Sequence, residues 1–74
     1  NEQFNKLLSV VGREDLQQYL LSLANGKTPT INKKDLELLL DLGIVTRDEN
    51  NRIHLTERGK YLVKAIKSHR ALSQ

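Results

Sequence analysis

The stretch that decides the fold runs from Leu38 to Ile66 and reads LLLDLGIVTRDENNRIHLTERGKYLVKAI. It opens with a leucine-rich segment that Gly43 is expected to end, because glycine readily adopts the left-handed conformation that closes a helix. A β-branched run at residues 44–46 follows, then a polar segment, and then Ile-His-Leu at residues 53–55. This pattern predicts a β-hairpin that follows directly on a helix.

The predicted hairpin has a four-residue loop, residues 48–51. With a loop of that length Arg47 lies opposite Arg52, and strand alternation divides the side chains between two faces. The inner face is predicted to hold Ile44, Thr46, Ile53 and Leu55, and the outer face Arg47, Arg52 and His54.

A last helix is predicted after the hairpin. Thr56 is a favourable N-cap, and Gly59 can let the helix approach the sheet closely because glycine has no side chain. The buried stripe of this helix is expected to contain Leu62, Val63 and Ile66.

Three helices are predicted in front of the hairpin. Apolar residues at i, i+3, i+4 and i+7 indicate amphipathic helices over residues 4–11 and 16–23. A turn region follows, in which Pro29 has no N–H to donate to a helix. Asn32 is then the N-cap of a third, short and heavily buried helix. The first helix is expected to bury Phe4, Leu7, Leu8 and Val11 and to end at Gly12, and the second to end at Asn25-Gly26.

This order of elements resembles the winged-helix family, a variant of the helix-turn-helix domains. The match is carried by Leu-Gly-Ile-Val at 42–45, by the polar-tipped hairpin, and by Leu-Thr-Glu-Arg-Gly-Lys-Tyr-Leu at 55–62. The resemblance covers less than half of the chain. It implies a mainly α fold with a two-stranded antiparallel hairpin: a winged helix with a three-helix core, a wing and a C-terminal helix. It also implies binding of double-stranded DNA, in transcription regulation or in DNA replication and maintenance.

Two alignments with this family remain open. In one, the three predicted helices correspond to the three family helices. In the other, the helix over 16–23 is the family's first helix, and the family's second helix is reduced to the loop at 28–31. Reduced winged helices of that kind are similar to those attached to P-loop ATPases, which often contact protein. The alternative function is therefore a protein–protein interaction module within a larger protein or ATPase, an analogy at the level of the fold.

The net charge of +3 is unevenly distributed. Residues 1–51 contain six basic and eight acidic residues, whereas residues 52–74 contain six basic residues and one acid. Such asymmetry indicates a polyanionic partner, although cations near a helix C-terminus also complement the helix dipole. Lys60, Lys64 and Lys67 fall on one stripe of the last helix, where they could follow phosphates, contact an acidic protein surface, support self-association, or simply be solvated.

Double-stranded DNA is the expected partner, and its candidate ligands lie on the third helix, the hairpin and the last helix. Lys33 and Lys34 stand at the helix end that enters the groove in helix-turn-helix docking. Glu37 and Asp41 make that face net neutral, and a Lys33–Glu37 ion pair on a solvated face is the competing interpretation. At the hairpin tip, Asp48 and Glu49 likewise oppose a DNA contact. The predicted DNA-binding residues are Thr28, Thr30, Asn32, Lys33, Lys34, Arg47, Arg52, Lys60 and Lys64.

Other classes of function find no support in the sequence. Neither His54 nor His69 stands at a spacing that implies a catalytic nucleophile or a carboxylate pair, so we expect no enzymatic activity. The chain has no Cys, and we expect no metal and no cofactor. No apolar run approaches the roughly 18 residues of a membrane span. We expect a domain of the cytoplasm, associated with the nucleoid, or of the nucleus. Because residue 1 is Asn, we expect residues 1–74 to be one domain excised from a longer protein.

Overall fold

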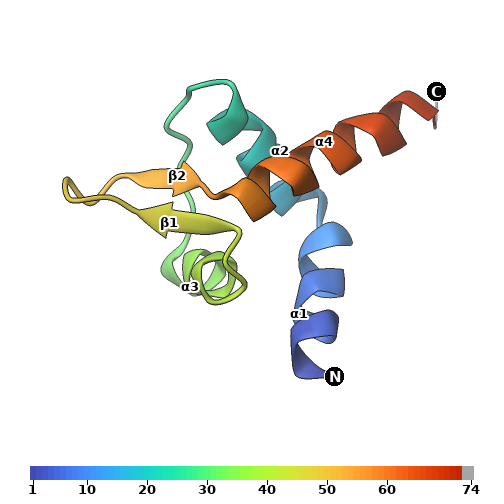
Figure 1. The fold of residues 1–74 in the computed structure, drawn as a ribbon, viewed down its shortest axis with the longest axis horizontal. Helices are drawn as coiled ribbons and strands as arrows, with labels where there is room; N and C mark the ends of the chain where they lie inside the picture. Colours follow the sequence, from blue (N-terminus) through green and yellow to red (C-terminus); the bar gives the residue numbers. More distant parts are fainter. Residues whose placement is uncertain (73–74) are drawn as a thin grey trace.

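The computed structural model describes residues 1–72, which form four helices and one two-stranded antiparallel sheet (Figure 1). The mainly α fold with a hairpin is therefore confirmed. In chain order the elements are α1 (Glu2–Val11), α2 (Glu14–Ala24), α3 (Lys33–Asp41), β1 (Val45–Arg47), β2 (Ile53–Leu55) and α4 (Glu57–Leu72).

The helix ends lie where the local signals predict them. Beyond the last turn of α3, Gly43 has a φ of +73°, and the Ile44 N–H donates to the Leu39 carbonyl at 3.0 Å. The same left-handed cap recurs after α2, where Gly26 has a φ of +78°. At the other end of α3, the side chain of Asn32 accepts a hydrogen bond from the Asp35 N–H, as an N-cap does.

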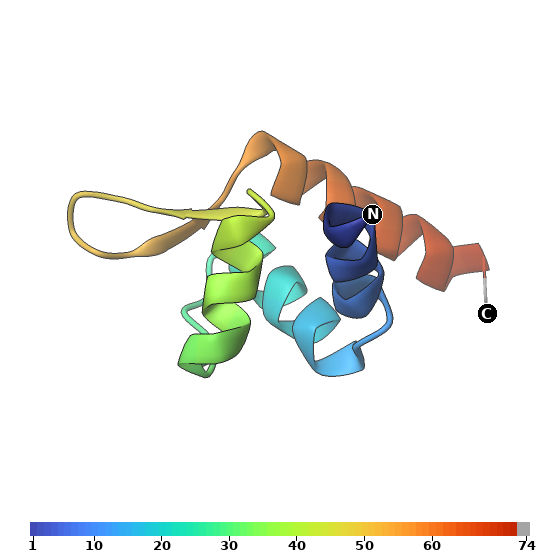
Figure 2. The ribbon, with the colours of Figure 1, turned by 90° about the horizontal axis from the view of Figure 1, so that it is seen from below.

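The core forms where α2 meets the hairpin, α4 and α1. The central helix α2 packs against α1, α4 and β2. In the view of Figure 2, α4 passes behind α1. Among the described residues the buried apolar side chains are Val10, Leu16, Tyr19, Leu20, Leu39, Leu42, Ile44, Val45, Val63 and Ile66. Of the predicted α4 stripe, Val63 and Ile66 are buried and Leu62 is partly buried.

Contacts between α4 and the α3–β1 junction hold the hairpin against the helices. A Cβ at Gly59 would lie 2.1 Å from the Ile44 carbonyl oxygen, so only glycine allows this approach. Thr56 caps α4 by accepting the Gly59 N–H at 3.1 Å, as predicted. Arg58 donates to the Leu42 carbonyl at 2.8 Å and so satisfies an acceptor at the C-terminal end of α3.

The predicted hairpin register is wrong by one residue. Arg47 pairs with Ile53, and not with Arg52, while Thr46 pairs with His54 and Val45 with Leu55. The loop has three residues because Asp48 pairs with Arg52 through its N–H, at 2.9 Å, and Asn51 adopts a φ of +64°. A one-residue change exchanges the faces of a strand, so Val45 is buried and Thr46 is exposed, the reverse of the prediction.

The predicted buried face of α1 is also wrong in part. Leu7 packs on the core and Val10 is fully buried, but Phe4, Leu8 and Val11 are 58%, 52% and 39% exposed. These side chains are exposed because α1 packs chiefly on α2, and its first turns extend away from the rest of the protein (Figure 1). One side of the apolar stripe is therefore buried and the other faces solvent.

Candidate nucleic-acid interface

The N-terminal end of α3 carries two exposed lysines next to the Asn32 cap, and the charge of Lys34 also helps to lower the pKa of Asp35. Lys33 and Lys34 are exposed, and no carboxylate of residues 1–72 pairs with either. The competing Lys33–Glu37 ion pair does not form. Asn32 is engaged twice with Asp35: its Oδ1 accepts the backbone N–H and its Nδ2 donates to the carboxylate, both at 2.8 Å. The Asn32 amide thus serves the helix cap.

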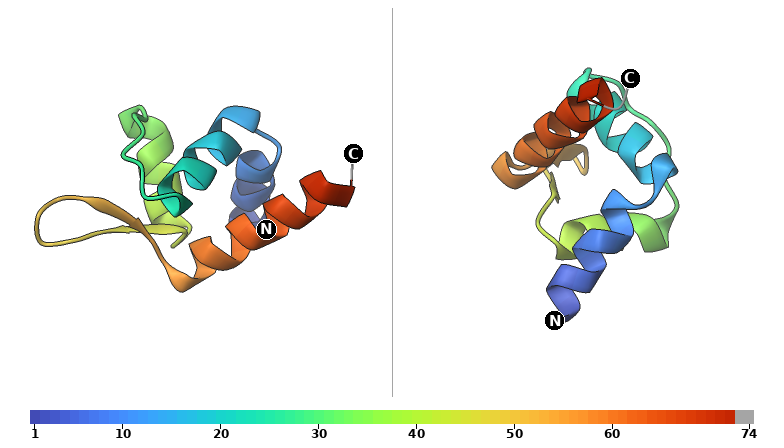
Figure 3. Two further views of the ribbon diagram at one scale, coloured as in Figure 1. Left: turned by 90° about the horizontal axis from the view of Figure 1, so that it is seen from above. Right: turned by 90° about the vertical axis from the view of Figure 1, so that its right-hand side faces the viewer.

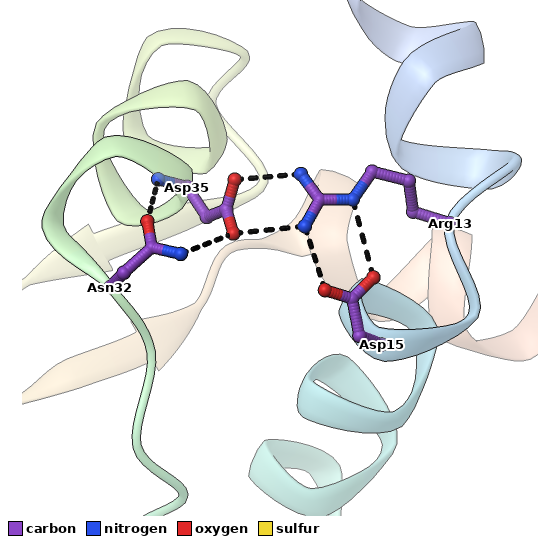
Figure 4. A network of polar contacts seen from close by, with 4 residues as sticks. All are labelled: Arg13, Asp15, Asn32 and Asp35. Carbon is purple, nitrogen blue, oxygen red and sulfur yellow. Dashed lines mark hydrogen bonds and ion pairs between the residues drawn. The ribbon is translucent and has the colours of Figure 1, made fainter.

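Asp35 also forms an ion pair with Arg13, which lies in the connection between α1 and α2 (Figure 4). Arg13 donates from Nη1 to Asp35 Oδ1 at 2.7 Å and from Nη2 to Oδ2 at 3.0 Å. The same guanidinium holds Asp15, at 3.2 Å from Nε and 2.7 Å from Nη2. The hydrogen bonds from Arg13, and then the one from Asn32, hold the pKa of Asp35 below its usual range. This network positions the first turn of α3 relative to α2.

The acid at the other end of α3 is also paired within the protein. Lys6 of α1 contacts the Asp41 carboxylate at 2.7 Å. The sequence alone predicts a net neutral exposed face for α3, in which Asp41 is an unpaired charge. With Asp41 balanced by Lys6, the charges left without a partner are Lys33, Lys34 and Glu37, a net of +1. Lys6 and Arg13 were missed because their partners are 35 and 22 residues away, beyond any local spacing rule.

At the hairpin tip, the carboxylate of Asp48 is also engaged within the protein. The Asp48 carboxylate accepts the backbone N–H groups of Asn50 and Arg52, each at 2.9 Å, and lies 2.7 Å from Nε2 of His54. The Arg52 N–H contributes most to holding the pKa of Asp48 below its usual value, and His54 contributes next. Glu49 is therefore the only acid of the loop without an intramolecular partner in the described chain. Arg47 and Arg52 are exposed and make no ion pair with residues 1–72.

The structure does not bring all of the predicted DNA-binding residues together. Thr28, Thr30, Arg52 and Lys60 line one open cavity of about 980 Å³ between the end of α2, the loop over 26–31, β2 and the start of α4. Lys33 and Lys34 lie at the far end of that loop, on α3. Lys64 is exposed further along α4, which leads away from α3 and the hairpin (Figure 3). Lys27, which sequence reasoning did not select, also lines the cavity.

No helix in residues 1–72 has both the length and the apolar composition of a membrane span. In the same part of the chain, no three His, Asp or Glu side chains come together as a possible metal site. Comparison of the chain with protein family models, with curated proteins and with solved structures finds no match.

Proposed function

We propose that the chain is a winged-helix domain that binds double-stranded DNA, with α3 as its recognition helix and the hairpin as its wing. Four helices and an antiparallel hairpin in this order are consistent with a winged-helix-like arrangement. α3 and the hairpin lie on the same side of the molecule, opposite the C-terminal end of α4 (Figures 1 and 2). One duplex can contact both from that side.

One observation carries the proposal: of the five acids on α3 and the hairpin, three are engaged inside the protein, whereas four cations of the same side make no ion pair. Asp35 is paired with Arg13, Asp41 with Lys6, and Asp48 with the backbone of its own loop. Lys33, Lys34, Arg47 and Arg52 make no ion pair within residues 1–72. Phosphates can therefore be neutralised at this surface without breaking an existing ion pair.

The roles follow from the chemistry of each group. Lys33 and Lys34 reach phosphates or base edges from the first turn of α3, as in helix-turn-helix docking. Arg47 and Arg52 contact phosphates or the minor groove beside the wing. Thr28 and Thr30 are exposed hydroxyl donors on the loop before α3 and contact phosphate.

The experiment is a titration of duplex DNA of random sequence into labelled protein at low salt, followed by measurement of affinity against salt. Roughly four phosphate contacts predict a slope of log K against log salt between about −3 and −4. Lys33→Glu with Lys34→Glu should abolish binding. Lys64 was predicted to bind DNA, but α4 leads away from α3 and the hairpin, and we leave Lys64 out of the proposed interface. Lys64→Glu with Lys67→Glu is therefore the matched control, because it changes the charge equally on exposed residues and should weaken binding only slightly. Binding that does not depend on salt, or equal losses in both double variants, would contradict the assignment.

A protein-interaction module is the second candidate function. It is favoured by the exposed Phe4, Leu8 and Val11 of α1 and by the lysine stripe of α4, which point to contacts outside α3 and the hairpin. Amide shift mapping in the same titration separates the two functions. Shifts at residues 28–35 and 47–52 support DNA binding, whereas shifts confined to α4, or none at all, support the module.

A further inference from the structure

The open cavity beside β2 is a groove with an apolar floor. Leu23 of α2, Ile31 of the loop, Ile53 and Leu55 of β2 and Val63 of α4 all contribute to its lining. Val63 is almost fully buried, and the other four are partly buried and remain accessible from the groove. Its volume of about 980 Å³ is large for so small a domain and lies at the upper end of ordinary ligand cavities.

One wall of the groove is a free strand edge. The Thr56 N–H donates to the Ile44 carbonyl and the Asp48 N–H to the Arg52 carbonyl, so the backbone groups of residues 52, 54 and 56 face β1. By the alternation of an antiparallel pair, the N–H and C=O groups of Ile53 and Leu55 face the opposite edge. Within residues 1–72 these groups make no hydrogen bond. The facing segment, Thr28 to Asn32, has no regular pairing with β2.

The rim of the groove carries positive charge only. Lys27, Arg52 and Lys60 line it, and no Asp or Glu does. Lys27 and Arg52 make no ion pair with the described chain, and Lys60 lies 3.5 Å from a Glu57 whose side chain is 94% exposed. An exposed pair of that kind contributes little, so Lys60 remains available to a partner.

We propose that this groove binds an extended acidic peptide segment of a partner protein, which adds to the β2 edge as a third strand. Its backbone pairs with Ile53 and Leu55, its alternate apolar side chains rest on the floor, and its acidic side chains meet the three cations of the rim. A nucleic-acid strand fits less well, because a sugar–phosphate backbone has neither the amide groups to pair with a strand edge nor side chains for an apolar floor. The inference stands independently of DNA binding through α3.

The probe is a capped synthetic peptide of alternating valine and glutamate, about the length of an ordinary strand. On titration into labelled protein, the Ile53 and Leu55 amides should shift and become protected from hydrogen exchange. The His54 amide, already facing β1, should change little. Protection of two alternate amides is the signature of strand addition, and electrostatic attraction alone does not produce it.

Two N-methylated forms of the peptide provide the internal control. Methylation of the residues whose N–H groups face β2 should abolish binding, and methylation of the intervening residues should leave it unchanged. These forms leave the protein unaltered, so the result does not depend on a variant that folds. Equal binding by both forms would overturn the strand pairing.

Protein variants test the charged rim. Lys27→Glu with Lys60→Glu should weaken peptide binding about tenfold, or ~1.4 kcal/mol. Lys64→Glu with Lys67→Glu should not, although it changes the net charge equally. Lys33→Glu with Lys34→Glu should lose DNA and keep the peptide, so failure of one proposal is distinguishable from failure of the other. Equal loss in the rim and control variants, or protection of Ile53 and Leu55 by single-stranded DNA and not by the peptide, would overturn the assignment.

Discussion

Arg13 and Asp35, 22 residues apart in the chain, form a two-point ion pair between the α1–α2 connection and the first turn of α3 (Figure 4). The backbone N–H of the same Asp35 donates to Oδ1 of Asn32, the N-cap of α3. The contact therefore sets the position of the helix end that carries Lys33 and Lys34. A planar guanidinium holds both carboxylate oxygens at once, and this fixes orientation as well as distance.

Removing this ion pair should affect DNA binding as well as stability. Arg13→Ala is expected to lower the melting temperature and to weaken duplex binding, because the start of α3 loses its connection to α2 and the Asp35 charge becomes free beside the lysines. Arg13→Lys keeps the charge but not the two-point geometry, and should recover only part of both effects. Thermal unfolding and a DNA titration on the same samples measure them. Unchanged values for Arg13→Ala would show that the contact is not structurally important.

Acid should remove the stability that this pair contributes. The folded-state pKa of Asp35 lies below its usual value, so the contribution is complete above the ordinary aspartate pKa of about 3.9. It is lost as the pH falls through the lower folded-state pKa. Denaturant unfolding across this range should therefore show a steeper loss of stability with falling pH in the native chain than in Asp35→Asn. Parallel curves for the two proteins would assign the acid sensitivity to other carboxylates.

Gly59→Ala should be among the most destabilising single-methyl additions in the chain. The new Cβ would lie 2.1 Å from the Ile44 carbonyl oxygen, and relief requires α4 to move off the sheet. Overpacking of this kind costs about 1–3 kcal/mol or more, and a backbone obstacle favours the upper end. The matched control is Gly12→Ala, whose new Cβ meets its nearest atom at 3.3 Å and which should cost less than about 1 kcal/mol. Chemical denaturation gives both values.

Leu39→Ala should cost roughly 2–5 kcal/mol of unfolding free energy, because Leu39 is completely buried and truncation leaves a cavity at the centre of the core. Leu72→Ala is the comparison: the side chain is 86% exposed, so almost no buried surface is lost. A loss below about 1 kcal/mol for Leu39→Ala would place it outside the core.

Asn51 controls the hairpin loop. Its φ of +64° is tolerated by asparagine and suits glycine better, so Asn51→Gly should keep the three-residue loop and be neutral or slightly stabilising. Asn51→Val should destabilise the hairpin, since a β-branched side chain resists that conformation. Cross-strand amide and Cα proton contacts between Thr46 and His54 report the register. An unchanged hairpin in Asn51→Val would show that the loop does not depend on the conformation of residue 51.

Local signals in the sequence determined where the elements begin and end. Asn32 and Thr56 cap helices, Gly26 and Gly43 close them in the left-handed conformation, and the close approach at Gly59 follows from its missing side chain. Each of these effects acts within a few residues or through the backbone alone. That is why the helical content, the hairpin and its place before the last helix were predictable.

Tertiary structure decided the rest, because the deciding partner was distant or the alternatives differed by one residue. The hairpin register depended on the conformation of Asn51 and on the Asp48 carboxylate, and a single residue of slip exchanged Val45 with Thr46. Periodicity identified the apolar stripe of α1, but only packing on α2 selected which side of it is buried. The charge available at α3 likewise depended on Lys6 and Arg13, whose partners no local pattern reveals.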